Sequence, residues 1–496
     1  MQRQRTGLDR EVIILGGVVV IGMIMAILDA TIVNVAIPTL GAEFHTSIST
    51  IQWVMTAYLL ALASTIPVSG WAGARFGTKP VWIASLALFT LGSCLAGAAP
   101  SIEVLIASRV IQGAAAGLIM PVGQTILLHA AGPRRIGRVM SVVGIPMLLA
   151  PIAGPVIGGA IVEETTWRWI FFVNLPVAAI ALTLAWRLLP NTAPERDERL
   201  DVRGLALLSP GIAIAVYGLS EIGSAGTVDA QAVALMAIGV ALVAGFAAHA
   251  WRLQGRALID ISLFARRGFA AAAATNLLLG IALFGSLILL PLYYQLVRGE
   301  SPLDTGLLLV PQALGAALAM PLAGRLTDEI GAHVVIPVGV LLALAGTAVY
   351  TQIGPETSYA TLGGALFLIG LGLGGTIVPS MAVAFQSAGR AAAADATAAI
   401  NVIQRIAGSI GTALIAVVLQ HSISARIPGA GGSLESVQSG AGTDVSGELA
   451  AAFGATFWVA LALVAAALVP ALLLPRSQNA EAGAPAAAGT PQSSRS

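Results

Sequence analysis

The chain has 496 residues, of which 57% are hydrophobic and only 10% are charged, and its formal net charge is +1. Soluble domains carry ~25% charged residues, so 10% could not cover the surface of a soluble fold of this length. The high apolar and low charged fractions all but exclude a soluble enzyme and a disordered chain. A secreted disulfide scaffold is excluded too, because Cys94 is the single cysteine. The near-zero net charge gives no reason to expect a nucleic-acid partner.

Apolar runs long enough to cross a bilayer dominate the sequence. A transmembrane helix needs ~20 mostly apolar residues, and helices satisfy their own backbone hydrogen bonds in lipid. The first run is too long for a signal peptide, and it ends in a polar stretch. We therefore predict an all-α integral membrane protein with 14 transmembrane helices. In chain order they are 12–40, 51–70, 80–98, 102–129, 138–162, 168–189, 202–222, 230–250, 268–297, 304–325, 333–353, 359–385, 397–420 and 452–475.

The basic residues indicate how these helices are oriented. With a cytoplasmic N-terminus, 20 of the 25 lysines and arginines fall on the cytoplasmic side and three fall outside. The remaining two, Arg109 and Arg405, lie within helices. An odd number of helices would scramble this asymmetry. We expect a multi-pass protein of the cytoplasmic (plasma) membrane with both termini in the cytoplasm.

Two stretches of the sequence repeat each other at an offset of 254 residues. Both sit at the cytoplasmic end of the second helix of a six-helix set. The matched positions are Pro67 and Pro321, Gly70 and Gly324, and Gly77 and Gly331. Parallel repeats around a central cavity are a recurrent transporter architecture.

The repeat predicts two six-helix bundles with two helices inserted between them. We expect the following segments: a cytoplasmic N-terminal tail (1–11), an N-terminal bundle (12–189), a linker with two extra helices (190–267), a C-terminal bundle (268–475) and a disordered cytoplasmic tail (476–496).

Asp29 is the only acid that we place deep within a helix. A carboxylate near the bilayer centre is costly, so it faces a cavity or a cation, or it takes up a proton. Arg109 on the fourth helix is its natural partner, and Gln112 lies one turn further on. Two readings of this group stay open: a proton-coupling or cation-recognising site, or a fixed structural ion pair that ties helices together.

Small residues recur on the fifth helix at Ala150, Gly154 and Gly158, and Gly159 follows directly. A bare face lets helices approach closely, and Pro155 removes a backbone donor and can kink the helix. This face suits an interface between moving halves, although plain packing is the commoner reason for such a pattern.

The repeated loops carry charges beside their glycines. Arg75 lies between Gly70 and Gly77, and Asp328 lies between Gly324 and Gly331. These charges can tie helix ends together and hold one conformation, or they can reflect only the basic bias of the cytoplasmic side.

Further polar residues lie within apolar runs, where they either line a cavity or bridge helices. The candidates for the cavity are Asn34, Gln112, Asn276, Gln312, Asn401, Gln404 and Arg405. The histidines show no metal-ligand spacing, and no phosphate-binding loop is present. We therefore expect no metal, no cofactor and no enzymatic activity.

Five segments of this chain resemble the major facilitator superfamily, and more narrowly its fourteen-helix drug:H+ antiporters. The resemblance extends from Val12 to Leu474. It rests on Leu28–Pro38, Gln52–Leu59, Arg109–Gly117, Ala150–Gly159 and Trp167–Pro176. One position departs from the pattern, because Ala74 stands where the loop motif usually carries an acid, although Asp328 keeps that acid in the second half.

The resemblance implies a proton-coupled multidrug exporter that works by alternating access, with Asp29 as the proton-coupling acid and Arg109 as its partner. The expected partners are protons, the bilayer and a hydrophobic, amphipathic or cationic drug or antibiotic, and we expect a monomer. Three alternatives remain: a dedicated exporter of one endogenous metabolite or lipid, an importer, and a membrane sensor that transports nothing.

Overall fold

The computed structural model describes residues 10–131, 153–154, 157–191, 199–225, 229–253, 257–389, 392–427 and 446–475, and these contain helices and no strand. The first set of helices is α1 (Arg10–Phe44), α2 (Ile48–Thr65), α3 (Val68–Phe76), α4 (Thr78–Gly97), α5 (Ile102–Ala131), α7 (Trp169–Phe172) and α8 (Asn174–Leu188). Then follow α9 (Val202–Ala225), α10 (Ala230–Leu253) and the short 3₁₀ helix η1 (Ile261–Ala265). The last set is α11 (Arg267–Leu296), α12 (Pro302–Ile330), α13 (Ala332–Tyr350), α14 (Tyr359–Ala388), α15 (Ala393–Arg426) and α17 (Ser446–Leu472).

The helices confirm a many-spanning membrane protein. Within the described ranges, 12 segments are long and apolar enough to cross a membrane, and the bent pair α2–α3 makes one more. The predicted span 138–162 lies mostly outside the described residues, and its described residues, 153–154 and 157–162, are helical. The helix count is therefore consistent with the 14 expected.

The second predicted span, 51–70, is not one straight helix. The chain bends by 56° between Thr65 and Val68, and α3 then continues to Phe76. Pro67 stands at the bend, where it has no backbone N–H to continue the hydrogen-bond ladder of α2. The sixth span, Trp169–Leu188, remains one span, with the single residue Val173 between α7 and α8.

The internal repeat extends to the backbone. Gly77 ends α3 with φ 86° and ψ 146°, and Gly331 ends α12 with φ 92° and ψ 149°. Both pairs of angles fall in a region that residues with a Cβ rarely adopt, which explains why glycine stands at both positions. The repeat is thus a repeat of structure as well as of sequence.

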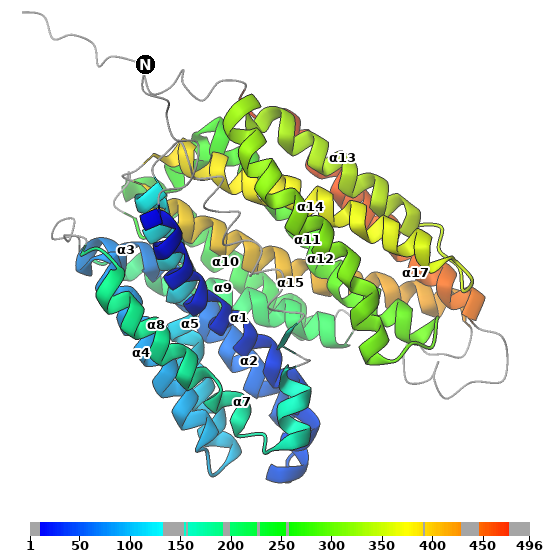
Figure 1. Cartoon of the computed structure of the whole chain (residues 1–496), viewed down its shortest axis with the longest axis horizontal. Coiled ribbons are helices and arrows are strands. Elements are labelled where there is room, and N and C mark those ends of the chain that lie inside the picture. Colours follow the sequence, from blue (N-terminus) through cyan, green and yellow to red (C-terminus); the bar gives the residue numbers. More distant parts are fainter. Residues whose placement is uncertain are drawn as a thin grey trace, which may run out of the picture.

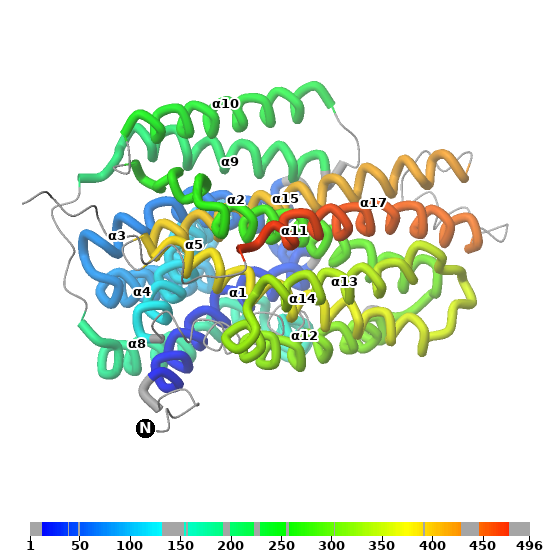
Figure 2. The backbone as a smooth tube through the Cα atoms, turned by 90° about the horizontal axis from the view of Figure 1, so that it is seen from above, coloured from blue at the N-terminus to red at the C-terminus, as the bar shows by residue number. Residues whose placement is uncertain are grey.

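The helices form two bundles with a further pair beside them (Figure 1). Helices α1, α2, α4, α5 and α8 pack together, and so do α11 to α15 and α17. Figure 2 shows α9 and α10 as a layer on one side of the molecule, with α10 outermost. Helix α9 contacts α2 of the first bundle and α15 of the second, so the inserted pair spans both.

Aromatic and aliphatic side chains hold α9 against both bundles. The rings of Trp53 on α2 and Tyr217 on α9 stack with their centroids 5.7 Å apart. Leu219 and Ile222 of α9 pack with Ala413 of α15. The inserted pair therefore rests on apolar contacts across the line where the bundles meet.

Basic residues gather at one end of the bundles. Arg75, Lys79, Arg187 and Arg266 all lie at that end of their helices, which we call the basic end. Lys79 Nζ donates to the carbonyl oxygens of Trp186 (2.9 Å) and Leu189 (2.7 Å). This lysine satisfies carbonyls that the end of α8 leaves without a helical donor.

Asp201 fixes the inserted pair at the basic end. Its Oδ1 accepts from the backbone N–H of Gly204 (2.8 Å) and lies 2.9 Å from His249 Nε2 on α10. Burial acts to raise the pKa of Asp201, but these contacts, with a hydrogen bond from the Leu258 N–H, hold that pKa below its usual value. The carboxylate thus joins the start of α9 to the end of α10.

Candidate site in the first bundle

Asp29 lies past the middle of α1, and its side chain is completely buried, as is that of Arg109. An isolated charge in this position would lose its hydration with no compensation. The two side chains meet instead, with Arg109 Nη1 2.5 Å from Asp29 Oδ2. The pairing expected from the sequence is therefore present.

Two amides complete the coordination of the Asp29 carboxylate. Its Oδ1 accepts hydrogen bonds from Gln112 Nε2 (3.0 Å) and from Asn174 Nδ2 (2.8 Å). Gln112 Oε1 also accepts from Arg109 Nη1 at 2.9 Å. Both carboxylate oxygens therefore have donors, which is the arrangement that a buried charge requires.

Ser93 on α4 closes the network from the fourth side. Its Oγ accepts from Gln112 Nε2 at 2.6 Å and from Asn174 Nδ2 at 3.2 Å. The network therefore joins α1, α4, α5 and α8, and all its members are buried. We call Asp29, Ser93, Arg109, Gln112 and Asn174 the Asp29 network.

Aromatic rings enclose the arginine. Its guanidinium carbon lies 4.0 Å from the centroid of the Tyr58 ring and 5.8 Å from that of Phe171. Arg109 Nε donates to the carbonyl of Val54 at 3.1 Å, and Tyr58 Oη donates to the carbonyl of Ala26, also at 3.1 Å. These contacts tie α2 to α1 and α5 around the ion pair.

The chemistry of the pair is asymmetric. Arginine keeps its proton in proteins, so Asp29 is the member whose charge can change. Protonation of Asp29 would remove the charge that compensates Arg109 and would weaken the hydrogen bonds from three donors. The arrangement can therefore convert the gain or loss of one proton into a change in how α1 is held against α5.

The structure brings some of the predicted residues together and leaves others apart. Gln112 joins Asp29 and Arg109, whereas Asn34 is exposed on α1 and lies outside the Asp29 network. The prediction from the residue pattern missed Asn174 and Ser93. Asn174 lies in a segment that carried the family resemblance, and that was the available signal for it.

In the second bundle the predicted polar residues are dispersed. Asn276 Nδ2 donates to Ser380 Oγ at 3.0 Å and joins α11 to α14. Asn401 Nδ2 donates to Gln124 Oε1 at 2.8 Å and so connects α15 to α5 of the first bundle. Gln312, Gln404 and Arg405 are half-buried.

The small residues of the fifth predicted span contact α1 close to Asp29. A Cβ on Gly154 would lie 2.0 Å from Thr31 Oγ1, and one on Gly158 would lie 2.9 Å from the carbonyl oxygen of Ile32. A Cβ on Gly159 would meet nothing nearer than 4.0 Å. Close packing of this face is thus observed, while Pro155 lies outside the described residues.

The repeated loop contacts the other bundle at the basic end. Gly70 on α3 is buried, and a Cβ there would lie 3.0 Å from Asp395 Oδ1 at the start of α15. The second copy, with buried Gly324 and exposed Asp328, ends α12. An acid therefore approaches the first loop from α15, near the place where Ala74 replaces the usual acid of the loop itself. That charges in these loops hold one conformation stays a prediction.

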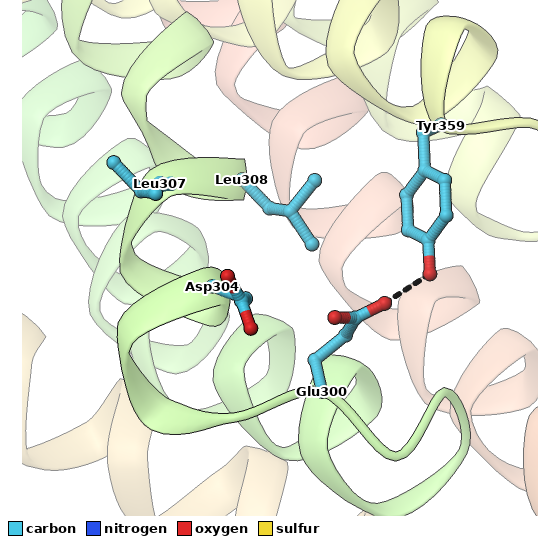
Figure 3. A pocket seen from close by; sticks show the side chains of 5 residues that line it. All are labelled: Glu300, Asp304, Leu307, Leu308 and Tyr359. Atoms are coloured by element: carbon cyan, nitrogen blue, oxygen red, sulfur yellow. Dashed lines mark hydrogen bonds between the residues drawn. The ribbon is translucent and has the colours of Figure 1, made fainter.

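A surface pocket of about 230 Å³ lies far from the Asp29 network, at the end of the second bundle opposite the basic end. Figure 3 shows its lining: Glu300, Asp304, Leu307, Leu308 and Tyr359. The Tyr359 hydroxyl donates to the Glu300 carboxylate, and the Tyr359 ring lies 4.3 Å from the guanidinium of Arg298. Hydroxyl groups therefore bond to both acids of this pocket, because the Ser301 hydroxyl donates to Asp304 Oδ2 at 2.6 Å.

The described residues contain no group of three or more histidine, cysteine or acidic side chains placed to hold a metal ion.

Comparison with known proteins identifies relatives of the whole chain. The sequence profile of the Major Facilitator Superfamily matches residues 19–412. A Multidrug resistance protein B homolog of Mycobacterium tuberculosis (strain ATCC 25618 / H37Rv) is 41% identical over 500 residues, which cover 96% of this chain and 93% of that protein. The Multidrug export protein EmrB of Haemophilus influenzae is 32% identical over 394 residues, covering 79% of this chain and 77% of that protein.

Two solved structures share the fold at low sequence identity. The crystal structure of the human organic anion transporter MFSD10 (TETRAN) aligns with a TM-score of 0.60 at 16% identity, covering 92% of this chain and 100% of that one. The proton:xylose symporter XylE aligns with a TM-score of 0.61 at 13% identity, covering 92% of this chain and 94% of that one.

Proposed function

Because the chain belongs to the major facilitator superfamily and is a multi-pass membrane transporter, we propose that it is a proton-coupled antiporter of the plasma membrane. It exports hydrophobic or amphipathic drugs by alternating access. The basic end faces the cytoplasm, as the excess of lysine and arginine on one side favours. The names of its relatives, which include a multidrug resistance protein homolog and a multidrug export protein, support export as the direction.

The observation that supports proton coupling is the buried carboxylate of Asp29, which accepts hydrogen bonds from three side chains on two other helices. Ionisable groups within the membrane are costly and commonly serve ion or proton pathways. Since Arg109 cannot release its proton, Asp29 is the member of the pair that can carry one.

A transport cycle follows from this assignment. A proton that reaches Asp29 from outside neutralises the carboxylate and frees Arg109 from its ion pair. Helices α1 and α5 then lose a charge-assisted hydrogen bond, and the balance between the outward-facing and inward-facing states shifts. Release of the proton to the cytoplasm restores the ion pair. The drug crosses in the opposite direction between the two bundles.

Transport by everted membrane vesicles tests the coupling. With Asp29→Asn we expect proton-driven dye uptake to fall to the level of vesicles without the protein, because the amide cannot take up and release a proton. The matched control is Asp260→Asn, because asparagine can also cap η1. This variant should transport the dye at the wild-type rate. Uptake by Asp29→Asn at the wild-type rate, with equal protein in the membrane, would remove Asp29 from the mechanism.

The breadth of the substrate range separates multidrug export from the alternative of one dedicated compound. Vesicles supplied with a panel of chemically unrelated dyes should take up several of them if the protein is a multidrug exporter. Uptake of a single compound would favour a dedicated exporter of a metabolite or lipid.

A further inference from the structure

Arg405 is the second arginine within the membrane, and it has a different environment from Arg109. It lies 12 residues beyond the start of α15, or about 18 Å along the helix at 1.5 Å per residue. Its side chain is half-buried, and among the described residues it has no carboxylate within ion-pair distance. Its helix α15 packs against α3 and α5 of the first bundle.

The sequence contains no acid that could reach this depth. In the two bundles, every aspartate and glutamate other than Asp29 lies in the first or last turn of a helix or between helices. This holds also for 104–162, which contains no acid at all. On the inserted helix α9, Glu221 is exposed and interacts with Tyr217.

Asp29 is not available as a partner for Arg405. Its carboxylate is buried and already accepts hydrogen bonds from Arg109, Gln112 and Asn174. The charges of Asp29 and Arg109 cancel, so Arg405 is the arginine deep within the described part of the two bundles whose charge has no carboxylate partner.

Arg405 belongs to a polar face of α15. The residues of this face are related by spacings of three and four, which place them on one side of the helix. They are Asn401, Gln404, Arg405, Ser409 and Thr412. Ile410 and Ala413, on the other side, pack with Leu219 of α9, while Asn401 contacts Gln124 of α5. The polar face is therefore directed toward the first bundle and away from lipid.

We propose that Arg405 is the anion-recognition group of the substrate site between the two bundles, and that this transporter prefers amphiphiles that carry a carboxylate or phosphate. The guanidinium is planar, is always charged and matches both groups with two parallel hydrogen bonds. This proposal rests on the proposed function, because it assumes that the substrate crosses the membrane between the two bundles. It reverses the cation preference expected from the sequence, because the one acid is engaged within the first bundle.

Binding to the purified full-length protein in neutral phosphatidylcholine nanodiscs tests this directly. The probes are a dansylated eight-carbon carboxylic acid, its primary amide and the corresponding amine, read by dansyl fluorescence. We expect the wild type to bind the acid at least about tenfold more tightly than the amide, the difference expected for a hydrogen bond between charged groups. The amine should bind more weakly than the acid.

The variants isolate the contribution of the charge. Arg405→Gln should bind acid and amide equally, while Arg405→Lys should keep part of the preference for the acid. Arg252→Gln, at an exposed arginine near the end of α10, should behave as the wild type. Unchanged binding of the amide shows that a variant is folded. A preference for the acid that persists in Arg405→Gln, or a wild type that binds the amine most tightly, would overturn the proposal.

Two sources could supply such an anion, a dissolved amphiphilic acid or an anionic lipid. Nanodiscs that contain phosphatidylglycerol separate them: loss of probe binding points to the lipid headgroup, and unchanged binding points to a dissolved acid. These binding measurements need no proton gradient. A missing preference for the acid would therefore refute the role of Arg405 without refuting Asp29-dependent transport, and the reverse is also possible.

Discussion

At the scale of single residues, the Asp29 network shows how one buried charge determines its surroundings. Removing a carboxylate and a guanidinium from water costs several kcal/mol per ion, which is recovered only if the remaining hydrogen-bonding atoms find partners. Here Gln112 and Asn174 supply them for the carboxylate, and Ser93 holds these two amides, whereas Arg109 Nη2 has no partner among the described residues. The residues beside the ion pair are therefore expected to matter almost as much as the pair itself.

Asn174→Ala tests this expectation. The change leaves Asp29 Oδ1 and Ser93 Oγ each without one donor, in a place where water does not replace it. We expect the free energy of unfolding to fall by about 1–3 kcal/mol and proton-driven dye efflux to fall with it. Thermal unfolding in detergent and everted-vesicle transport measure the two effects. The control is Asn191→Ala, at an exposed residue, which should change neither the melting temperature nor the efflux rate. An unaltered melting temperature for Asn174→Ala would show that the Asn174 amide does not stabilise the Asp29 carboxylate.

The sequence could identify part of this network and not the rest. Asp29 and Arg109 stand out because charges are rare in apolar runs, and Gln112 follows from helical spacing. Ser93 and Asn174 do not stand out, because serine is common in membrane helices and Asn174 lies near the start of its predicted span rather than deep within it. Whether they face a carboxylate or lipid depends on the rotation of α4 and α8, which hydrophobicity alone does not fix.

At the scale of elements, the positions of the spans follow from length and hydrophobicity, but their shapes do not. The bend at Pro67 depends on a missing backbone donor, which a count of apolar residues ignores. The glycine face of the fifth span is an intermediate case. Its close packing was predictable from spacing, whereas its partner, the turn of α1 that follows Asp29, required the structure.

Gly154→Ala and Gly159→Ala form a matched pair that tests this contact. The added methyl at Gly154 would lie 2.0 Å from Thr31 Oγ1 and 2.8 Å from Thr31 Cβ, so α1 must shift, whereas at Gly159 the nearest atom is 4.0 Å away. Overpacking of this kind costs about 1–3 kcal/mol. We expect Gly154→Ala to lower both the melting temperature and the efflux rate, and Gly159→Ala to leave both unchanged. Equal effects of the two variants would show that this packing does not constrain α1.

At the scale of the whole molecule, the internal repeat explains two bundles, but it does not say how they meet. Their contacts at the basic end involve α3, α5 and α15: Asp395 approaches Gly70, and Asn401 donates to Gln124. Such pairs join residues more than 250 positions apart, so no local pattern in the sequence could have revealed them. Alternating access requires these contacts to break when this end opens.

Asn401→Ala should therefore shift the balance between conformations. Gln124 is buried and its Nε2 has no partner among the described residues, so loss of the Asn401 donor leaves the whole amide unsatisfied in the closed arrangement. A penalty of about 1–3 kcal/mol corresponds to roughly a five- to 150-fold change in the population ratio. The distance between spin labels at positions 76 and 330 measures the opening of the basic end. Phe76 and Ile330 are exposed and equivalent in the two repeats. Cys94→Ala removes the native cysteine, so that only these two positions are labelled.

Asn276→Ala is the matched control for this shift, because the Asn276 amide bonds to Ser380 within the second bundle and crosses no interface. Both variants remove a buried amide, so both should lower the melting temperature by similar amounts. We expect Asn401→Ala alone to add a population with a longer distance between the labels, since of these two bonds only the one from Asn401 joins the bundles. A longer distance in both variants would show that general destabilisation opens the basic end. No change in either variant would show that another contact closes it, for example the one between Gly70 and Asp395.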